Sequence, residues 1–341
     1  MPEPVALVEL PPALTSPASH PDARYLLGID GGATKTLAAV LDLQARTVHL
    51  GRAGPSNEDA VGPKAAVEAL LAAAAEALEG AGIAEGELGA AVAAVAGTDT
   101  ASVAGHVRKV RPDWIVVNDV VGAWATATGG GPGVGAIAGT GSNVFGVGQH
   151  GRSWRTGGWG HLLGDEGSGY WLGVESVRAA LRDRDGSGPE TALAAAACEF
   201  FARDTVEAVA SLVYSKPLTK GEIAAFGIPA AKVAEQGDAV ALELFERGAT
   251  LLGGQIATVI ARTGLEGAFP IGLIGSAYKA GEIYLAPLRR RVARDAPEAQ
   301  MSLVEIPPVG GSLLLAAVGC GRRDHIEPDE LTGLLGVPVE D

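Results

Sequence analysis

Residues 139–170 read GTGSNVFGVGQHGRSWRTGGWGHLLGDEGSGY and hold eleven glycines, two tryptophans and the acidic pair Asp165–Glu166. Glycine at this density is typical of backbone that lies close to a ligand or turns through positive φ. The run Gly139-Thr140-Gly141-Ser142 offers bare backbone N–H groups and two hydroxyls, which suit a phosphate group. Taken alone, such a run more often forms a plain hairpin turn. Its meaning therefore depends on the rest of the chain.

A second hairpin of the same kind lies near the N-terminus. Residues 25–30 form an apolar run that ends in an acid, residues 31–36 form a Gly/Thr turn, and residues 37–42 are apolar again. The same order of strand, turn and strand recurs over residues 134–147. Two glycine-rich hairpins, each starting a block of strands, indicate an old internal duplication.

Apolar runs and helical periodicity alternate along the remainder of the chain. We expect further strands at 47–52, 88–97, 114–119, 269–274 and 301–306. We expect helices at 60–79, 99–110, 120–128, 167–181, within 186–214, and at 219–225, 238–263, 282–294, 311–319 and 329–335. This alternation predicts an α/β fold. Acids and glycine turns stand at the strand ends, where ligand sites of α/β sheets usually lie.

The chain has 341 residues, which exceeds the usual size of one hydrophobic core and favours two domains. The clearest break in composition is the GGGPG run at 129–133, which reads as a turn or hinge. We expect an extended or disordered N-terminal arm at 1–24 and an N-terminal α/β domain at 25–120, with 323–341 a candidate addition to it. A C-terminal α/β domain with a helical insertion would span 121–322.

Charge and cysteine content exclude several classes of function. The net charge of −14 argues against nucleic acid or an anionic membrane as a partner. No apolar run approaches the length of a membrane span, and the N-terminus lacks the features of a secretory signal. Cys198 and Cys320 offer neither a disulfide framework nor metal-ligand spacing, which suits a reducing cytoplasm.

The two hairpins combine with two acids into a chemical pattern. Asp30 precedes the first turn, and Asp119 ends a strand that lies between the two hairpins in sequence. Two phosphate-binding turns that face each other, with an acid beneath them, are what phosphoryl transfer from a nucleotide requires. The simpler alternatives are that Asp30 caps a turn, that Asp119 is a helix N-cap, and that Asp165 and Glu166 cap the following helix.

The chain resembles the acetate-kinase/sugar-kinase/actin superfamily. Within it, the chain is similar to the BadF/BadG/BcrA/BcrD group, which includes N-acetylglucosamine kinases and related glucosamine kinases. The motifs that carry this resemblance are residues 28–36, 118–119, 138–143, 157–168 and 272–276. The resemblance implies a two-domain α/β protein with the actin-like ATPase fold, also called ribonuclease H-like, and a cleft between the domains.

The resemblance also implies which residues bind ATP and Mg²⁺. Thr34 and Lys35 would form the first phosphate loop, and Asp30 would order the waters of the magnesium ion. The second phosphate loop would hold Thr140 and Gly141, and Gly275 would lie beside the adenine. Ala33 departs from the pattern, because many relatives have glycine there. Its methyl group fits only if φ stays negative.

By the same resemblance Asp119 is the catalytic base and also contacts the sugar. The residues expected to hold the sugar with it are Asn57, Ser142, Asn143, Gly158, Trp159, Gly160 and Asp165. The expected activity is transfer of the γ-phosphoryl group of ATP to the 6-hydroxyl of D-glucosamine, in the cytoplasm and in a protein that is a candidate homodimer. The bias towards glucosamine comes from the acidic residues near the sugar motifs, which would attract an ammonium group.

Three alternatives stay open at this point. One is an N-acetylglucosamine kinase, which would need an apolar wall such as Trp159 for the acetyl group. Another is an ATPase that activates a dehydratase through an iron–sulfur cluster, which would need clustered cysteine thiolates. The third is a sugar sensor without catalysis, which would have no need for Asp119.

Overall fold

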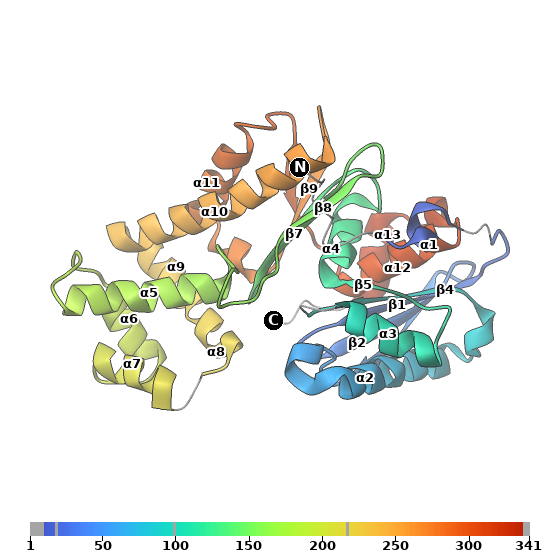
Figure 1. The fold of residues 1–341 in the computed structure, drawn as a ribbon, viewed down its shortest axis with the longest axis horizontal. Coiled ribbons are helices and arrows are strands. Elements are labelled where there is room, and N and C mark those ends of the chain that lie inside the picture. The colour runs from blue at the N-terminus through green and yellow to red at the C-terminus, as the bar shows by residue number, and fades with distance from the viewer. Residues whose placement is uncertain (1–9, 18–19, 98–99, 216–217, 337–341) are drawn as a thin grey trace, which may run out of the picture.

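The computed structural model describes residues 10–17, 20–97, 100–215 and 218–336. Two five-stranded sheets form two lobes (Figure 1). The first sheet has the order β3-β2-β1-β4-β5, and its strands are β1 (Tyr25–Gly31), β2 (Thr36–Asp42), β3 (Thr47–Ala53), β4 (Leu88–Val95) and β5 (Ile115–Asn118). The second has the order β10-β9-β6-β7-β8, and its strands are β6 (Gly133–Ala138), β7 (Ser142–Val147), β8 (Ser153–Gly157), β9 (Pro270–Ile274) and β10 (Gln300–Leu303).

The two sheets share one topology. In the first, β1 pairs antiparallel with β2 and parallel with β4. In the second, β6 pairs antiparallel with β7 and parallel with β9. Each lobe therefore begins with a hairpin followed by parallel strands, as the repeat in the sequence predicts. This common plan places the turn after β1 and the turn after β6 at equivalent ends of their sheets.

Strand alternation explains how helices cover both faces of the first sheet. Leu27 and Ile29 pack with α2 (Glu58–Ala81) and α3 (Thr100–Val110), whereas Leu26 packs with α4 (Asp119–Thr128) and α12 (Pro308–Gly319). A Cβ atom at Gly28 would lie 2.6 Å from the backbone nitrogen of Leu313, so only glycine lets α12 approach so closely.

Helix α4 also joins the two lobes. Its Trp124 packs edge-on against Phe145 of β7, with ring centroids 5.7 Å apart, and both belong to the core that contains α12. Although α12 lies inside the predicted range 121–322, it packs on the first sheet. The division of the chain into domains stays a prediction.

The second lobe carries the helical insertion between β8 and β9. Its helices are α5 (Gly169–Arg184), α6 (Leu193–Phe200), α7 (Val206–Ser215), α8 (Lys220–Ala225), α9 (Gly227–Glu235) and α10 (Ala239–Thr263), and α11 (Glu282–Val292) follows β9. Helix α10 packs on β7 and β8, and the lobe has its own core. The remaining elements are α1 (Pro12–Thr15), α13 (Pro328–Leu335) and the short 3-10 turns Glu85–Glu87, Ser276–Ala280 and Arg323–His325.

The elements differ from the sequence-based expectations in three places. Strand β8 and helix α9 were not expected. The N-terminal arm is not wholly extended, because α1 buries Leu14 in the core beside α12, and the His20 amide donates to the carbonyl of Cys320. Residues 1–9, the start of the predicted helix at 99, the break at 216–217 and residues 337–341 lie outside the described residues.

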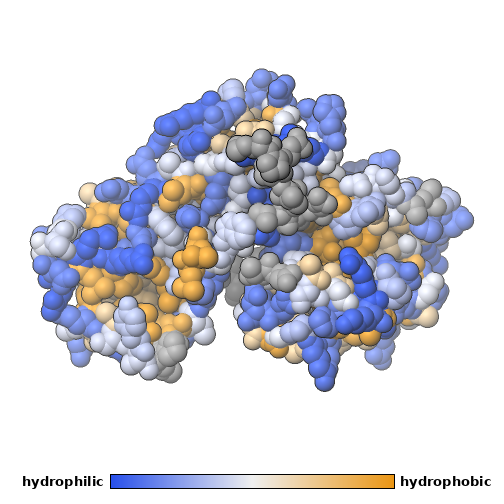
Figure 2. Space-filling model, viewed as in Figure 1, coloured by the Kyte–Doolittle hydropathy of each residue, from blue (hydrophilic) through white to orange (hydrophobic). Residues whose placement is uncertain are grey.

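The space-filling view shows a notch in the surface between the two lobes (Figure 2). Within the described ranges, no helix is long and apolar enough to cross a membrane.

Candidate functional site

The turn between β1 and β2 at residues 31–36, called the first phosphate turn after its expected role, is tied to the start of α2. The amide of Gly32 donates to the carbonyl of Lys35, and the carbonyl of Gly32 accepts from the amides of Ser56 and Asn57. Ala33, Thr34 and Lys35 are exposed at the tip. Ala33 does not adopt positive φ, so its methyl group brings no backbone strain. Asn57 is the N-cap of α2, with its side chain accepting from the Asp59 amide at 2.9 Å.

The turn between β6 and β7 at residues 139–141, called the second phosphate turn after its expected role, is held between two other elements. Its carbonyls at Gly139 and Thr140 accept from the amides of Gly169 and Tyr170 at the start of α5. Gly275 follows β9 with φ of 123°, and a Cβ atom there would lie 2.5 Å from the carbonyl oxygen of Ala138. Thr140 is exposed at the tip of the turn. The end of β9, the turn at 139–141 and α5 therefore meet at one point. That this point binds phosphate and a nucleoside stays a prediction.

Asp30 and Asp119 stand at strand ends of the first sheet, and both are half-buried. The pKa of Asp30 is raised to about 7, mainly by burial and also by the negative charge of Asp119, while Lys35 opposes the shift. Burial also raises the pKa of Asp119 to about 6, against a hydrogen bond from the Val120 amide and the attraction of Arg155 and Lys220. Asp119 is the first residue of α4, and Asn118, not Asp119, is the N-cap. The Asp119 carboxylate is thus not the helix cap, although its Oδ1 accepts from the Val120 amide at 2.9 Å.

A pair of asparagines connects the lobes next to Asp119. Nδ2 of Asn143 on β7 donates to Oδ1 of Asn118 at 3.3 Å, whereas the buried Oδ1 of Asn143 makes no hydrogen bond within the described part of the chain. Nδ2 of Asn118 donates to the carbonyl of Gly97 and to Thr100. A Cβ atom at Gly158 would lie 2.8 Å from Nδ2 of Asn143. Gly158 thus leaves the Asn143 amide room, and Oδ1 is an acceptor that a ligand hydroxyl could satisfy.

Asp165 is buried and already has partners. Its Oδ1 accepts from the Ser142 amide at 3.0 Å, and its Oδ2 lies 2.7 Å from Nζ of Lys220 on α8. The Ser142 hydroxyl donates to the carbonyl of Glu166, and Oε2 of Glu166 accepts from Gln255. Asp165 adopts φ of 61°, a left-handed conformation that holds the carboxylate under the second phosphate turn.

Sequence reasoning missed two basic residues of this region. A Cβ atom at Gly141 would lie 2.9 Å from Nζ of Lys220, so this lysine touches the second phosphate turn. Arg155 on β8 is only 7% exposed, and its guanidinium lies 5.7 Å from the ring centroid of Trp159. Neither residue belongs to a local motif, because their partners are brought in by the fold.

A cavity of about 170 Å³ lies next to Gly275. It is formed by α5, α9 and the turn Ser276–Ala280, and its apolar lining includes Leu172, Ala231 and Phe245. Its size and apolar walls suit the base of a nucleoside. The position of adenine beside Gly275 stays a prediction.

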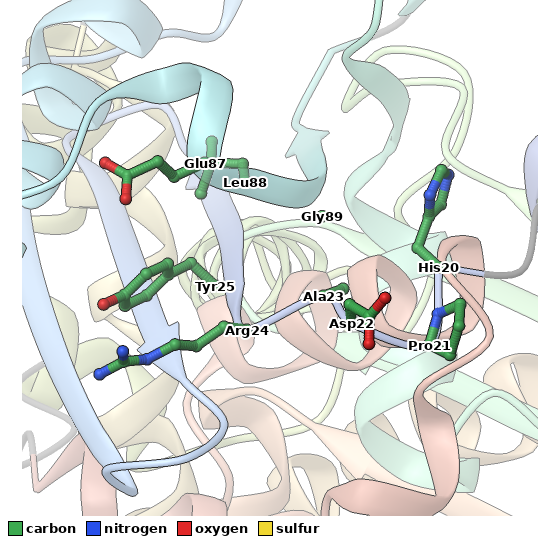
Figure 3. Close-up of a pocket in the computed structure, with 9 residues that line it drawn as sticks. All are labelled: His20, Pro21, Asp22, Ala23, Arg24, Tyr25, Glu87, Leu88 and Gly89. Carbon is green, nitrogen blue, oxygen red and sulfur yellow. The ribbon is translucent and has the colours of Figure 1, made fainter.

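A larger hollow lies elsewhere and has no part in this site (Figure 3). It is lined by residues 20–25 and 87–89, at the beginnings of β1 and β4, whereas Asp30 lies near the end of β1. Arg24 there is held by Asp42, with Nη2 and Oδ2 2.7 Å apart.

Comparison with known proteins identifies the family. Residues 27–316 match the BadF/BadG/BcrA/BcrD ATPase family. The chain belongs to this family. The resemblance of the sequence motifs to this group is therefore confirmed, and the family name implies the use of ATP.

Two proteins that are similar to this chain are sugar kinases by name. The chain is 33% identical over 211 residues to an N-acetylmuramic acid/N-acetylglucosamine kinase of Clostridium acetobutylicum, which covers 59% of this chain and 68% of the relative. It is 29% identical over 309 residues to an N-acetyl-D-glucosamine kinase of Dictyostelium discoideum, which covers 85% of this chain and 97% of the relative.

The fold matches a solved structure of the same kind. The crystal structure of a candidate N-acetylglucosamine kinase from Chromobacterium violaceum superposes with a TM-score of 0.68, at 23% identity, over 87% of this chain and all of the other. The predicted two-domain actin-like ATPase fold is confirmed.

The cysteines of this family member lie far from any common site. Cys198 is on α6 of the second lobe, and Cys320 is buried at the end of α12, on the first sheet. Within the described ranges, no group of three or more His, Cys, Asp and Glu side chains could hold a metal ion. Neither cysteine is placed to hold an iron–sulfur cluster together with the other.

Proposed function

We propose that this protein transfers the γ-phosphoryl group of ATP to the 6-hydroxyl of an N-acetylated hexosamine. The observation that carries the proposal is that Asp119 directly follows Asn118, whose side chain accepts a hydrogen bond from Asn143 of the other lobe. A carboxylate there reaches an acceptor hydroxyl held by Asn143, while the turns hold the phosphates.

The two acids fit the metal that kinases use. Asp30 and Asp119 are half-buried, and burial makes their negative charges unfavourable. A divalent cation would offset these charges. Mg²⁺ keeps most of its waters and is usually held by one or two carboxylates and the substrate phosphates, so Asp30 is the residue proposed to hold it. When bound, the ion would neutralise charge that develops on the phosphates.

The chain's own residues would act in a simple sequence. The carboxylate of Asp119 accepts the proton of the sugar hydroxyl as that oxygen attacks the γ-phosphorus, and the bond from phosphorus to the β-phosphate oxygen breaks to release ADP. Backbone N–H groups of the two turns and Nζ of Lys220 stabilise the phosphoryl oxygens. Closure of the lobes excludes water, so the sugar is the acceptor.

The choice of sugar follows from the charges around Asp165. The sequence alone favoured glucosamine because acids near the sugar motifs would attract an ammonium group. In the structure Asp165 is paired with Lys220, and Glu166 accepts from Gln255. Less uncompensated negative charge is left for an ammonium, and both relatives above are named for N-acetylated sugars. These points support N-acetylglucosamine over glucosamine.

A panel of sugars tests the proposal. Release of ADP from magnesium-ATP is measured with N-acetylglucosamine, glucosamine, N-acetylmuramic acid and glucose, and kcat/KM is compared because specificity is that ratio. Mass spectrometry and phosphorus NMR locate the phosphate on the product. We expect N-acetylglucosamine to exceed glucosamine. A product phosphorylated at the anomeric oxygen, or ADP release that no sugar stimulates, would overturn the proposal.

A further inference from the structure

Arg155 lies on the face of β8 that is turned towards the first lobe. Its partner across the sheet is Phe145, and Asn143 pairs with Gly157 two positions along. Residues directly opposite in an antiparallel pair point to the same side, so Arg155 shares a face with Asn143. Trp154 points to the other face, where the guanidinium of Arg262 lies 5.0 Å from its ring centroid. Arg155 is therefore part of the wall of the site that contains Asn143.

One donor of the Arg155 guanidinium lacks a hydrogen-bond partner. The side chain is buried, and its Nε atom makes no hydrogen bond with any described residue. The described residues also include no acid that forms an ion pair with it, although the charge of Asp119 attracts it. A buried N–H donor without a hydrogen bond is costly, so natural proteins seldom leave one unsatisfied. The missing partner is then expected to arrive with a ligand.

The position of Arg155 assigns that partner to the acceptor side. In the order β9-β6-β7-β8, strand β8 lies at the edge farthest from β9, and the second phosphate turn joins β6 to β7. The cavity beside Gly275 lies at the other end of this order. Arg155 is thus closer to the sugar-binding residues Asn143 and Trp159 than to the nucleoside. A guanidinium is always charged and offers a planar fork of donors that matches a carboxylate.

We propose that Arg155 is a specificity-determining residue that binds a carboxylate substituent on the acceptor, so that acidic amino sugars are substrates. This inference rests on the proposed function. It concerns the choice between a neutral hexosamine and the same hexosamine carrying an ether-linked carboxylate. N-acetylglucosamine and N-acetylmuramic acid differ in that way, and they serve as the two probes.

The experiment compares kcat/KM for the two probes in the wild type, in Arg155→Met and in Arg155→Lys. Arg152→Met is the matched control, because Arg152 is exposed on the same hairpin. A charge-assisted hydrogen bond corresponds to about 10- to 100-fold. We expect the ratio of the acidic to the neutral sugar to fall by that factor in Arg155→Met, to fall less in Arg155→Lys, and to stay constant in Arg152→Met.

The ratio separates a contact with the sugar from an effect through Asp119. If Arg155 acts on the ionisation of Asp119 or on folding, kcat/KM falls by the same factor for both sugars and their ratio does not change. That result would overturn the inference. A wild type that neither phosphorylates nor binds the acidic sugar would overturn it as well. Thermal unfolding checks that Arg155→Met is folded, and Arg155→Lys keeps the charge if it is not.

Failure of the proposed function can be told apart. If no sugar stimulates ADP release, calorimetric binding of the two probes decides the matter. If the wild type binds the acidic probe more tightly than the neutral probe, and Arg155→Met loses this preference, the inference stands even though the kinase proposal fails. Equal binding of both probes by the wild type ends it.

Discussion

Asp119 raises the pKa of Asp30, although the two residues stand on different strand ends and β4 runs between their strands. The two half-buried carboxylates thus share one electrostatic environment. Because their pKa values rise to about 7 and about 6, the charge state of the pair changes within the physiological range. This coupling connects folding stability with the proposed chemistry.

Replacement of the acid at the start of α4 tests the base. In Asp119→Asn the side chain keeps its shape but cannot accept a proton, and loss of a general base usually lowers the rate by about 10²–10⁴-fold. We expect kcat to fall by that factor while the fold and ATP binding are kept. Asp113→Asn, an exposed residue ahead of β5, is the control. Near-wild-type kcat in Asp119→Asn would rule out the assignment.

Replacement of Asp30 tests whether its pKa is raised in the folded state, through the pH dependence of the unfolding free energy. The pKa of Asp30 rises from an ordinary value of 3.8 to about 7 in the folded state, so the fold favours the protonated acid. That contribution is fully present below pH 3.8 and is lost as the pH rises through about 7. We expect Asp30→Asn to be more stable than the wild type at pH 8, with the gain shrinking towards pH 4. Denaturant unfolding at both pH values measures this, and an equal difference at each would contradict it.

Lys220 tests the contact between the helical insertion and the second phosphate turn. Lys220→Met leaves the buried carboxylate of Asp165 without its cation and removes a positive charge beside Gly141. Because Lys220 is 34% exposed, we expect a loss of about 1–3 kcal/mol in unfolding free energy together with a higher KM for ATP. Lys64→Met, 90% exposed on α2, should change neither. Adding Asp165→Asn to Lys220→Met should restore the stability but not the KM for ATP. If both are restored, Lys220 does not contact the phosphates of ATP.

Gly158 tests the space left for Asn143. Alanine there would be strained at φ of 71° and would press on Nδ2 of Asn143, whereas Gly151, at φ of 77°, has open space around it. Both Gly158→Ala and Gly151→Ala should lose about 1 kcal/mol from backbone strain. Only Gly158→Ala should raise the KM for the sugar, by about tenfold if one hydrogen bond is lost. Equal KM values in the two variants would show that Asn143 does not hold the sugar.

Short-range features made most of the fold predictable. The turns at 31–36 and 139–141 are local, and the duplication of the hairpin predicted their equivalence. Strand β8 was not predicted because residues 148–157 are rich in glycine and polar residues and lack an apolar strand pattern. The strand forms by pairing with β7. The place of α12 depends on contacts such as Ser312 Oγ donating to the Ile29 carbonyl, 283 residues apart. Lys220 and Arg155 acquire their surroundings only through such distant packing.

Closure of the two lobes is the last expectation. The phosphate turns lie on different lobes and must converge on one nucleotide, and the chain crosses between lobes at residues 129–132 and 304–307. Gly129 and Gly130 have φ of 67° and 83°, a backbone that glycine tolerates and that can absorb a rotation. We expect small-angle X-ray scattering to show a smaller radius of gyration at saturating N-acetylglucosamine than without sugar. A sugar that is not phosphorylated serves as the control at the same concentration. An unchanged scattering profile with the substrate would mean that the lobes do not move when the sugar binds, and that water must be excluded at a later step.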